Sequence, residues 1–471
     1  MLLSFAPIAL LVLLLFSAVQ LFGADASYGP NQVALLIASA CAGLVGMYRG
    51  MSWAEVQDSM VDGIKVGLGP ILILLAVGGL IGSWMIAGTV PAMIYYGVSI
   101  LDPDIFFAAA AIICALASIS IGSSWTVAGT LGIGLIGIAD SYGLPPAIAA
   151  GAIISGAYFG DKLSPLSDTT NLAAACTSVD LFAHIRHMLW TTVPAFCVAL
   201  LFFSFIDSSS AAAPEQIAEL RAAIRGEFNV GIGVLVPLLI MLLLIWRKVP
   251  AYPAILLATI AGIVTALTLQ ADVVTKFALA ANPETTRPLV EGLWRTLFAG
   301  FEGTTSNESL NRLISKGGIA SMLNTVWLIV SALAFGGVLE RTGILKQILD
   351  AVLKAVKSTG DLVLATVTGG FITNILAADQ FLGIALPGRL FANTYDDFNL
   401  SRENLSRTLE DSATMTSALI PWNTCGAYMA ATLGVATFDY APYAIFNIAC
   451  PLIAIAFGYL LIKQKPATVP A

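Results

Sequence analysis

The sequence predicts an all-α polytopic membrane protein with about ten to thirteen transmembrane helices, each of the ~20 residues that a bilayer core requires. Three observations carry this prediction. Hydrophobic residues make up 58% of the 471 residues and charged residues only 11%, whereas soluble proteins average about 25% charged residues. The mean hydropathy is +0.88. Long apolar stretches recur from one end of the chain to the other.

Ten of the apolar stretches are clear. The first is interpreted as a retained helix and not as a secretory signal, because no Lys or Arg precedes it and many spans follow. Two further zones, 123–176 and 378–432, are apolar but broken by Gly, Pro and clustered polar residues. The clear stretches run near 3–22, 31–48, 66–87, 105–121, 189–206, 230–246, 251–269, 324–339, 361–377 and 441–462.

Lysine and arginine set the expected orientation in the inner membrane. The short loop 23–30 contains neither, whereas Arg49 follows the second span and Arg247 and Lys248 lie in a tight turn. Both termini are therefore expected in the cytoplasm. The net charge is −7 and the basic residues are scattered, so no nucleic-acid-binding patch is expected. The six cysteines form no CxxC pair and are interpreted as packing residues.

The two halves of the chain contain similar segments in the same order. Gly78–Leu80 recurs as Gly336–Val338, and the segment 161–167 recurs as 411–417 in the same order. The offsets are similar, 336 − 78 = 258 and 411 − 161 = 250. Duplicated halves with one broken polar zone apiece are typical of secondary transporters built from inverted repeats. A chance likeness between two Gly-rich stretches is the alternative.

The duplication predicts three regions. The middle one holds an extramembrane loop with a short helix, two spanning helices and a polar connector, where Leu293, Leu297 and Phe301 recur at helical spacing and predict an interfacial helix. The regions are the first transmembrane repeat, 1–206, with a polar hairpin near 123–176; the middle region, 207–323; and the second repeat, 324–471, with a broken polar zone near 374–432.

The densest polar cluster at apparent membrane depth lies in the first broken zone. Pro165 in its middle removes one helical hydrogen bond and clashes with the preceding turn, so the backbone is expected to open and free carbonyl oxygens. Carboxylate, hydroxyl, amide and carbonyl oxygens can together replace the hydration shell of Na⁺. A solvated loop outside the bilayer is the alternative. The predicted ligands are Asp161, Ser164, Ser167, Asp168, Thr169, Thr170 and Asn171.

The second broken zone supplies a partner cluster. Charged residues at membrane depth cost on the order of several kcal/mol and typically mark ion pathways or proton relays. Their recurrence in both halves predicts one shared site at the membrane midplane. An ion pair with Arg389 or Arg407 is the alternative for the two aspartates. The predicted ligands here are Asn374, Asp379, Asp411, Ser412, Thr414, Ser417 and Asn423.

Three smaller features carry weaker signals. The hydroxyls within 122–126 either line the same cavity or bond the carbonyls of their own helix. His184 and His187, in a short polar turn, are interpreted as surface residues, with a pH sensor as the alternative. Lys162 is expected to balance a neighbouring aspartate.

At these residues the sequence resembles the NhaC family of Na⁺/H⁺ antiporters, and the likeness extends over essentially the whole chain. Small departures are Phe381, where a tyrosine is expected, and Ala413, where a glycine is expected; neither removes a carboxylate. The matching elements are Gly160-Asp-Lys-Leu-Ser-Pro-Leu-Ser-Asp-Thr-Thr-Asn-Leu172, Ala378-Asp-Gln380 with Leu386-Pro-Gly-Arg389, Leu409-Glu-Asp-Ser412 and Leu419-Ile-Pro-Trp-Asn-Thr-Cys-Gly426.

The resemblance implies an ion-transporter-superfamily fold of two inverted repeats with re-entrant hairpins, in which a transport domain moves against a scaffold. It implies a secondary antiporter, not an enzyme, that exchanges Na⁺ for H⁺ by alternating access. No cofactor is expected, and Na⁺ enters only as the transported ion. The expected partners are Na⁺, H⁺ and membrane lipid, without nucleic acid, and a homodimer stays open.

Two other functions are weighed against antiport of Na⁺ and H⁺. Similar proteins of the family exchange organic acids such as malate and lactate, and Arg389 could then pair with a carboxylate substrate. An intramembrane aspartyl protease is a distant alternative, because paired aspartates in membrane helices can activate water. The segment Tyr158–Asp161 departs from the Gly-x-Gly-Asp pattern that such enzymes resemble.

Overall fold

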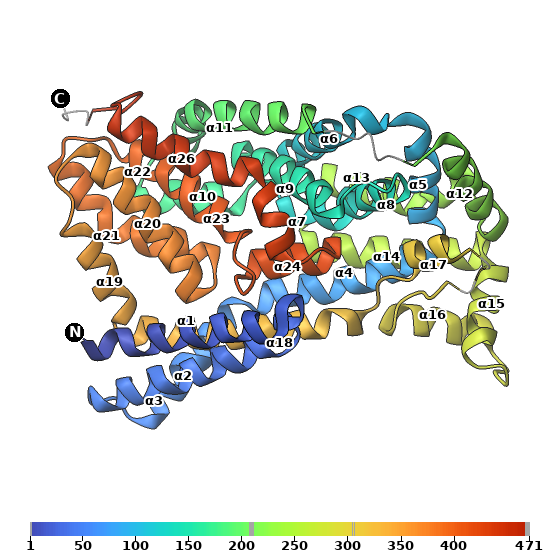
Figure 1. Cartoon of the computed structure of the whole chain (residues 1–471), viewed down its shortest axis with the longest axis horizontal. Coiled ribbons are helices and arrows are strands. Elements are labelled where there is room, and N and C mark those ends of the chain that lie inside the picture. The colour runs from blue at the N-terminus through green and yellow to red at the C-terminus, as the bar shows by residue number, and fades with distance from the viewer. Residues whose placement is uncertain (1, 207–211, 304, 306, 467–471) are drawn as a thin grey trace.

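The computed structural model describes residues 2–206, 212–303, 305 and 307–466, and every regular element among them is a helix (Figure 1). The predicted all-α class is confirmed. The loop predicted from residue 207 begins with residues 207–211, which lie outside the described residues.

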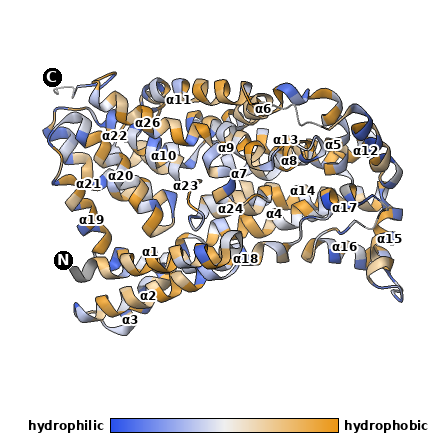
Figure 2. Ribbon diagram, viewed as in Figure 1, coloured by the Kyte–Doolittle hydropathy of each residue, from blue (hydrophilic) through white to orange (hydrophobic). Residues whose placement is uncertain are grey.

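Eight helices in the described chain are long and apolar enough to cross a membrane, or up to ten spans exist if each of two bent helix pairs is one span. One pair joins α12 (Pro214–Glu227) to α13 (Val236–Trp246) with a bend of 89°, and the other joins α25 (Thr437–Tyr440) to α26 (Ile445–Tyr459) with a bend of 57°. The eight helices, α13 and α26 overlap the ten apolar stretches of the sequence, whereas α12 lies before the stretch 230–246. Figure 2 shows the hydrophobic residues along α1, α4, α6 and α14. The eight helices are α1 (Leu2–Phe22), α2 (Pro30–Tyr48), α4 (Leu68–Ile86), α6 (Phe106–Ile121), α11 (Leu181–Ser204), α14 (Ala251–Leu269), α18 (Leu323–Arg341) and α20 (Thr359–Ala377).

The region between the repeats is also helical. The short helix predicted there is α12, and the amphipathic helix predicted from Leu293 and Leu297 is α16 (Pro288–Phe298). Trp294 on α16 is 68% exposed. Phe301, which the spacing assigned to this helix, lies beyond its end, because the helix stops before Gly300, whose φ is +95°. The helices α15 (Ala271–Ala281) and α17 (Glu308–Ile314) complete the connector.

Small residues let α6 and α9 (Pro146–Leu163) pack very closely. A Cβ added at Gly156 would lie 2.0 Å from the carbonyl oxygen of Ala111, so only glycine allows this approach. The Ser118 hydroxyl adds a hydrogen bond of 2.6 Å to the carbonyl of Ala157. This contact brings the end of α6, with the chain that follows it, beside the end of α9.

Both halves break their helices at equivalent positions. After α6, Gly122 has left-handed φ and Ser123 caps α7 (Ser124–Val127); after α20, Ala378 has left-handed φ and Asp379 caps α21 (Gln380–Asp397). The two caps are 256 positions apart (379 − 123). This repeated order of helix end, left-handed residue and cap supports the predicted duplication.

The second pair of breaks repeats with the same spacing. Ser167 caps α10 (Asp168–Thr177), and Asn423 caps α24 (Thr424–Leu433), again 256 positions apart (423 − 167). The offsets of 258 and 250 read from the sequence are therefore wrong in register, and Asp411 is not the structural counterpart of Asp161. The sequence comparison paired identical letters, whereas equivalent backbone positions carry different capping residues. Near the middle of Figure 1, α7 contacts both α9 and α24.

Candidate functional site

A cavity of about 290 Å³ lies where the first-half breaks meet the start of α21. Its apolar wall comes from Gly69, Pro70 and Ile73 at the start of α4, together with Trp125 and Phe381. Because Phe381 replaces an expected tyrosine, a hydroxyl is absent from this wall. No Lys or Arg lines the cavity within the described residues. The polar lining consists of Ser123, Asp161, Ser167, Asp168, Thr169 and Gln380.

Asp161 is the best-oriented carboxylate of this lining. It lies in the last turn of α9 and is 8% exposed. Its Oδ2 accepts hydrogen bonds from the backbone N–H of Ser124 at 2.9 Å and from the Ser124 hydroxyl at 2.6 Å. Because α7 holds one carboxylate oxygen, the other remains for a ligand in the cavity.

Asp168, Ser167 and Thr169 complete the first-half side of the cavity. Asp168 is the first residue of α10 and is exposed, while Ser167 and Thr169 are buried and their hydroxyls lie 3.1 Å apart. The start of α10 adds the positive end of a helix dipole, which lowers the electrostatic cost of gathering carboxylates there.

The predicted helix break at Pro165 is confirmed, but three predicted ligands serve the backbone of that break. The Thr170 hydroxyl donates to the carbonyl of Lys162 at 3.0 Å. The Asn171 amide donates to the carbonyls of Pro165 at 2.9 Å and Ser167 at 2.7 Å. The Ser164 hydroxyl accepts from the N–H of Leu166 at 3.3 Å. The structure therefore places these three outside the cavity lining, with freed carbonyls already bonded to side chains.

The predicted second-half residues Asn374, Asp379, Ser417 and Asn423 form a buried cluster behind Gln380. Asp379 Oδ1 accepts from the N–H groups of Phe381 at 2.9 Å and Leu382 at 3.0 Å. The Asn374 amide donates to the carbonyl of Ala413 at 2.6 Å and to the Thr416 hydroxyl at 2.9 Å, and the Asn423 amide donates to the carbonyl of Asn374 at 3.1 Å. The Ser417 hydroxyl reaches Gln380 Oε1 at 3.5 Å.

Asp411 lies in an ion pair that joins the two halves. The Lys162 ammonium donates to Asp411 Oδ1, which also accepts from the Thr191 hydroxyl at 3.0 Å and from Cys450 Sγ at 3.1 Å. Lys162 therefore pairs across the repeat, and the expectation that it balances a neighbouring aspartate is wrong. Arg407 Nε is 3.9 Å from Asp411 Oδ2, which supports the ion-pair alternative for Asp411.

Ser412 and Thr414 also lie away from the cavity lining. The Ser412 hydroxyl donates to the carbonyl of Leu409 at 3.2 Å. Thr414 Oγ1 is buried and has no hydrogen-bond partner within the described residues. Both belong to a π-helical turn, η6 (Glu410–Thr414), that continues α22 (Arg402–Leu409).

The predicted ligand set leaves out Glu410, Gln380, Ser123 and Ser124, although the sequence places all four in the two broken zones. Glu410 is fully buried, and neither of its carboxylate oxygens has a hydrogen-bond partner in the described part of the chain. The position of Glu410 next to Asp411 in the second broken zone could have indicated it from the sequence. For the hydroxyls within 122–126, the structure decides between the two alternatives: Ser123 lines the cavity and Ser124 orients Asp161.

The two histidines lie in α11 and not in a turn. His184 is fully buried, with Nδ1 2.8 Å from the Ser406 hydroxyl, and half-buried His187 has Nε2 3.0 Å from Asn404 Oδ1. The surface interpretation of His184 is therefore wrong, because α11 packs that face against α22.

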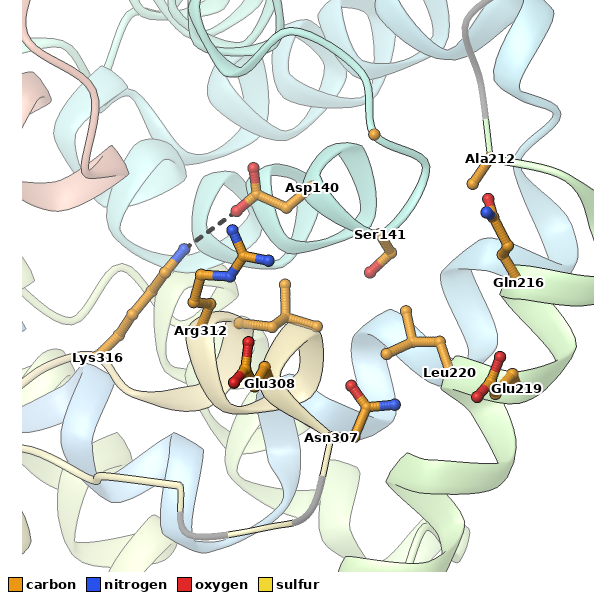
Figure 3. A pocket seen from close by; sticks show the side chains of 12 residues that line it. Asp140, Ser141, Ala212, Gln216, Glu219, Leu220, Asn307, Glu308, Arg312 and Lys316 are labelled. Atoms are coloured by element: carbon orange, nitrogen blue, oxygen red, sulfur yellow. Dashed lines mark hydrogen bonds and ion pairs between the residues drawn. The ribbon is translucent and has the colours of Figure 1, made fainter.

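A larger pocket, of about 840 Å³, lies elsewhere, between α8 (Ile133–Ser141), α12 and α17 (Figure 3). It carries charges of both signs, with Lys316 Nζ 3.3 Å from Asp140 Oδ2 and with Glu308 and Arg312 close by. None of the ligands predicted from the sequence lines it. The cavity beside Asp161 is therefore the candidate site.

Comparison with known proteins agrees with this chemistry. A family model described as the Na⁺/H⁺ antiporter family matches residues 156–461, which include both broken zones. The chain is 40% identical to the Na⁺/H⁺ antiporter NhaC of Alkalihalophilus pseudofirmus, over 92% of this chain and 89% of the relative. It is 37% identical to two Bacillus subtilis proteins: the Na⁺/H⁺ antiporter NhaC, over 92% of each chain, and the malate-2H⁺/Na⁺-lactate antiporter, over 91% and 89%.

Proposed function

The chain belongs to the Na⁺/H⁺ antiporter family, and we propose that it exchanges Na⁺ for H⁺ across the cytoplasmic membrane. The single observation that carries this proposal is Asp161, a carboxylate at a helix break with one oxygen held by Ser124 and the cavity on its other side. Na⁺ is a hard monovalent cation, and such a carboxylate together with hydroxyl and amide oxygens is a suitable set of ligands for it. Ser167, Thr169 and Gln380 supply those oxygens.

Exchange follows from competition for the same carboxylate. A proton on Asp161 removes the charge that attracts Na⁺, and bound Na⁺ opposes protonation. The two ligands therefore lower each other's affinity by the same factor. Asp168, on the same cavity wall, carries a second carboxylate that takes part in the same competition.

Alternating access is supported by the origin of the cavity wall. Most polar lining comes from the first half, while Gln380 and Phe381 come from the second. The Lys162–Asp411 ion pair joins the two halves, so movement of both sets of helix breaks together against the start of α4 would change the cavity. The placement of Arg49, Arg247 and Lys248 in short loops favours cytoplasmic termini in the inner membrane.

Exchange of an organic acid, as in the malate–lactate relative, is less well supported by the site. A carboxylate substrate needs a cationic partner, and Arg389, the residue considered for that role, is exposed and absent from the cavity lining. The described lining carries two carboxylates, which would repel an anion. Na⁺ and H⁺ alone fit this lining best.

Acid-loaded proteoliposomes test the proposal. Wild-type protein should release luminal protons when Na⁺ is added without any organic acid, and Asp161→Asn should reduce that release to the level of protein-free liposomes. Asp62→Asn, which alters an exposed carboxylate of α3 (Trp53–Val66), is the matched control and should exchange normally. Strict dependence of wild-type exchange on malate or lactate would overturn the proposal, and so would normal exchange by Asp161→Asn.

A further inference from the structure

The helix that orients Asp161 is too short to hold its own position. α7 has four residues, and irregular backbone lies on both sides of it: Gly122, with φ of +73°, precedes it, and a π-helical turn, η3 (Ala128–Gly132), follows it. Helices shorter than about 12 residues are marginal without tertiary contacts. Ser124 of α7 nevertheless donates two hydrogen bonds to Asp161. Contacts with other helices must therefore fix where these two donors point.

Tyr428 of α24 makes two such contacts with α7. Its ring stacks on the Trp125 ring, with the ring centroids 4.0 Å apart and an angle of 13° between the planes. Its hydroxyl donates to the carbonyl of Trp125 at 2.9 Å. Trp125 lines the cavity, whereas Tyr428 is fully buried and is not among the described residues that line it. Tyr428 can therefore act on the site through α7 but is no ligand itself.

The π-helical turn after α7 packs against the same hydroxyl. A Cβ added at Gly129, within η3, would lie 2.8 Å from the Tyr428 hydroxyl oxygen, so the close approach depends on the missing side chain at this position. The hydroxyl of Tyr428 thus contacts both the carbonyl of Trp125 and the turn that continues the chain. These contacts hold α7 at its C-terminal end, where its own backbone pattern changes from α to π.

The start of α24 ties Tyr428 to the second-half break. The N–H of Thr424, the first residue of α24, donates to the carbonyl of Ala378 at 2.9 Å. Asn423, which caps the same helix, donates from its amide to the carbonyl of Asn374 at 3.1 Å. Both acceptors lie at the end of α20. A tyrosine fixed at the second-half break therefore contacts the short helix that orients the first-half carboxylate.

We propose that Tyr428 is a positioning residue of the ion site. It holds α7 so that the N–H and the hydroxyl of Ser124 bond one oxygen of Asp161 and the other oxygen stays directed at the cavity. Hydrogen bonds weaken steeply when their distance or angle is wrong, so a displaced α7 would let the carboxylate turn and would weaken Na⁺ binding with every ligand still present. The inference rests on the proposed function, because Na⁺ is the ion whose affinity it concerns.

Equilibrium binding of radioactive Na⁺ to the purified full-length protein tests this role. Tyr428→Phe keeps the stacked ring and removes only the hydroxyl, and its Kd for Na⁺ should rise by roughly threefold to tenfold with the number of sites unchanged. Tyr96→Phe is the matched control, because it removes a hydroxyl that donates to the carbonyl of Val230 at 2.7 Å, outside the described cavity lining. Its Kd should equal that of wild type.

A double-mutant cycle separates positioning from a general loss of structure. Ser124→Ala removes one of the two donors to Asp161 and should itself raise the Kd. Because Tyr428 acts through Ser124, adding Tyr428→Phe to Ser124→Ala should raise the Kd by a smaller factor than in the wild-type background, whereas independent effects would multiply. Gly129→Ala, whose added Cβ displaces the same hydroxyl, should also raise the Kd and serves as the second variant if Tyr428→Phe does not fold.

The outcomes distinguish this inference from the proposed function. Saturable Na⁺ binding by wild type with an unchanged Kd in Tyr428→Phe and Gly129→Ala would overturn the positioning role and leave the proposed function standing. A rise in Kd by equal factors in both Ser124 backgrounds would do the same. Absence of saturable Na⁺ binding by wild type would overturn the proposed function and the positioning role together.

Discussion

The first-half break after α6 and the second-half break after α20 have the same backbone geometry but use a carboxylate differently. In the first half a serine, Ser123, caps the new helix, and Asp161 reaches the cavity from another helix. In the second half the cap is itself a carboxylate, Asp379, whose Oδ1 accepts from two backbone N–H groups. In the first half the helix cap needs no carboxylate, and Asp161 is available to the cavity. In the second half the carboxylate of Asp379 is used to cap a helix.

The polar side chains of the second-half cluster are held mainly by other protein groups. Asp411 is held by Lys162 and Thr191, and the Asn423 amide donates to the backbone carbonyl of Asn374. The segment 463–466 lies along α22, with the Lys465 N–H donating to Asn404 Oδ1 at 3.0 Å. We infer that the first-half break binds the ion and that much of the second-half cluster holds the site in place.

The sharpest test of this difference is the same substitution at both carboxylates. Asp379→Asn should keep exchange within about tenfold of wild type, a difference below ~1.4 kcal/mol, because asparagine caps helices as well as aspartate. Asp161→Asn should abolish exchange. Initial rates of Na⁺-driven proton release in proteoliposomes would measure both effects. Loss of exchange in Asp379→Asn would make that residue a cation ligand, as the sequence predicts, and would remove the contrast between the halves.

Features that depend on neighbouring residues in the sequence can be predicted better than contacts between residues far apart in the sequence. Apolar stretches of spanning length predict the helices because hydropathy acts residue by residue, and a proline within a polar run predicts the break near Asp161. The role of Asp411 is different, because its partner Lys162 lies 249 positions away. The burial of His184 cannot be predicted for the same reason, because its partner Ser406 is 222 positions away in the sequence.

Chemical type alone also leaves the roles of polar residues undecided. Asn171 carries an amide that suits a cation or a backbone carbonyl equally well, and only the fold shows that it bonds the carbonyls of Pro165 and Ser167. Glu410 is the reverse case. Its full burial is a property of the packed fold, because α10 of the first half lies against the turn that carries it.

The next largest effect concerns the ion pair between the halves. Lys162→Met should destabilise the protein by roughly 3–5 kcal/mol, because it removes the close partner of buried Asp411 and leaves only Arg407, 3.9 Å away. The double variant Lys162→Met/Asp411→Leu should recover most of that loss, since replacing both charges with apolar groups removes the uncompensated ion. Denaturant unfolding in detergent, followed by tryptophan fluorescence, would measure both.

Lys65→Met is the matched control for that experiment. Its partner Asp62 is 69% exposed, so the change should cost at most about 1 kcal/mol. If Lys162→Met were no more destabilising than Lys65→Met yet altered exchange strongly, Lys162 would belong to the transport chemistry and not to the anchoring of the second half.

The smallest effect concerns the contact between segment 463–466 and α22. Burial of Glu403 opposes its ionisation, but the hydrogen bonds from the Lys465 ammonium, the Ser401 side chain and the backbone, together with the charge of Lys465, outweigh it and lower the pKa of Glu403 to about 2, from an ordinary value of 4.5. A lowered pKa in the folded state means that this contact stabilises the protein fully above about pH 4.5 and is lost as the pH falls toward 2.

Glu403→Gln should reproduce that loss at neutral pH, where the fold is otherwise unchanged. We expect hydrogen exchange at the amides of Lys465 and Ser401, which bond Asn404 Oδ1 and the carbonyl of Lys465, to rise by up to about fivefold at pH 7, equivalent to ~1 kcal/mol for a partly exposed ion pair. Exchange at α9 should not change, because no hydrogen bond joins α9 to segment 463–466 in the described residues, and Glu340→Gln, which alters an exposed glutamate, should leave both regions as in wild type. Wild-type protection that persists unchanged through pH 3 would show that ionised Glu403 does not hold segment 463–466, and faster exchange at α9 in Glu403→Gln would show that the loss of this contact extends to the first half.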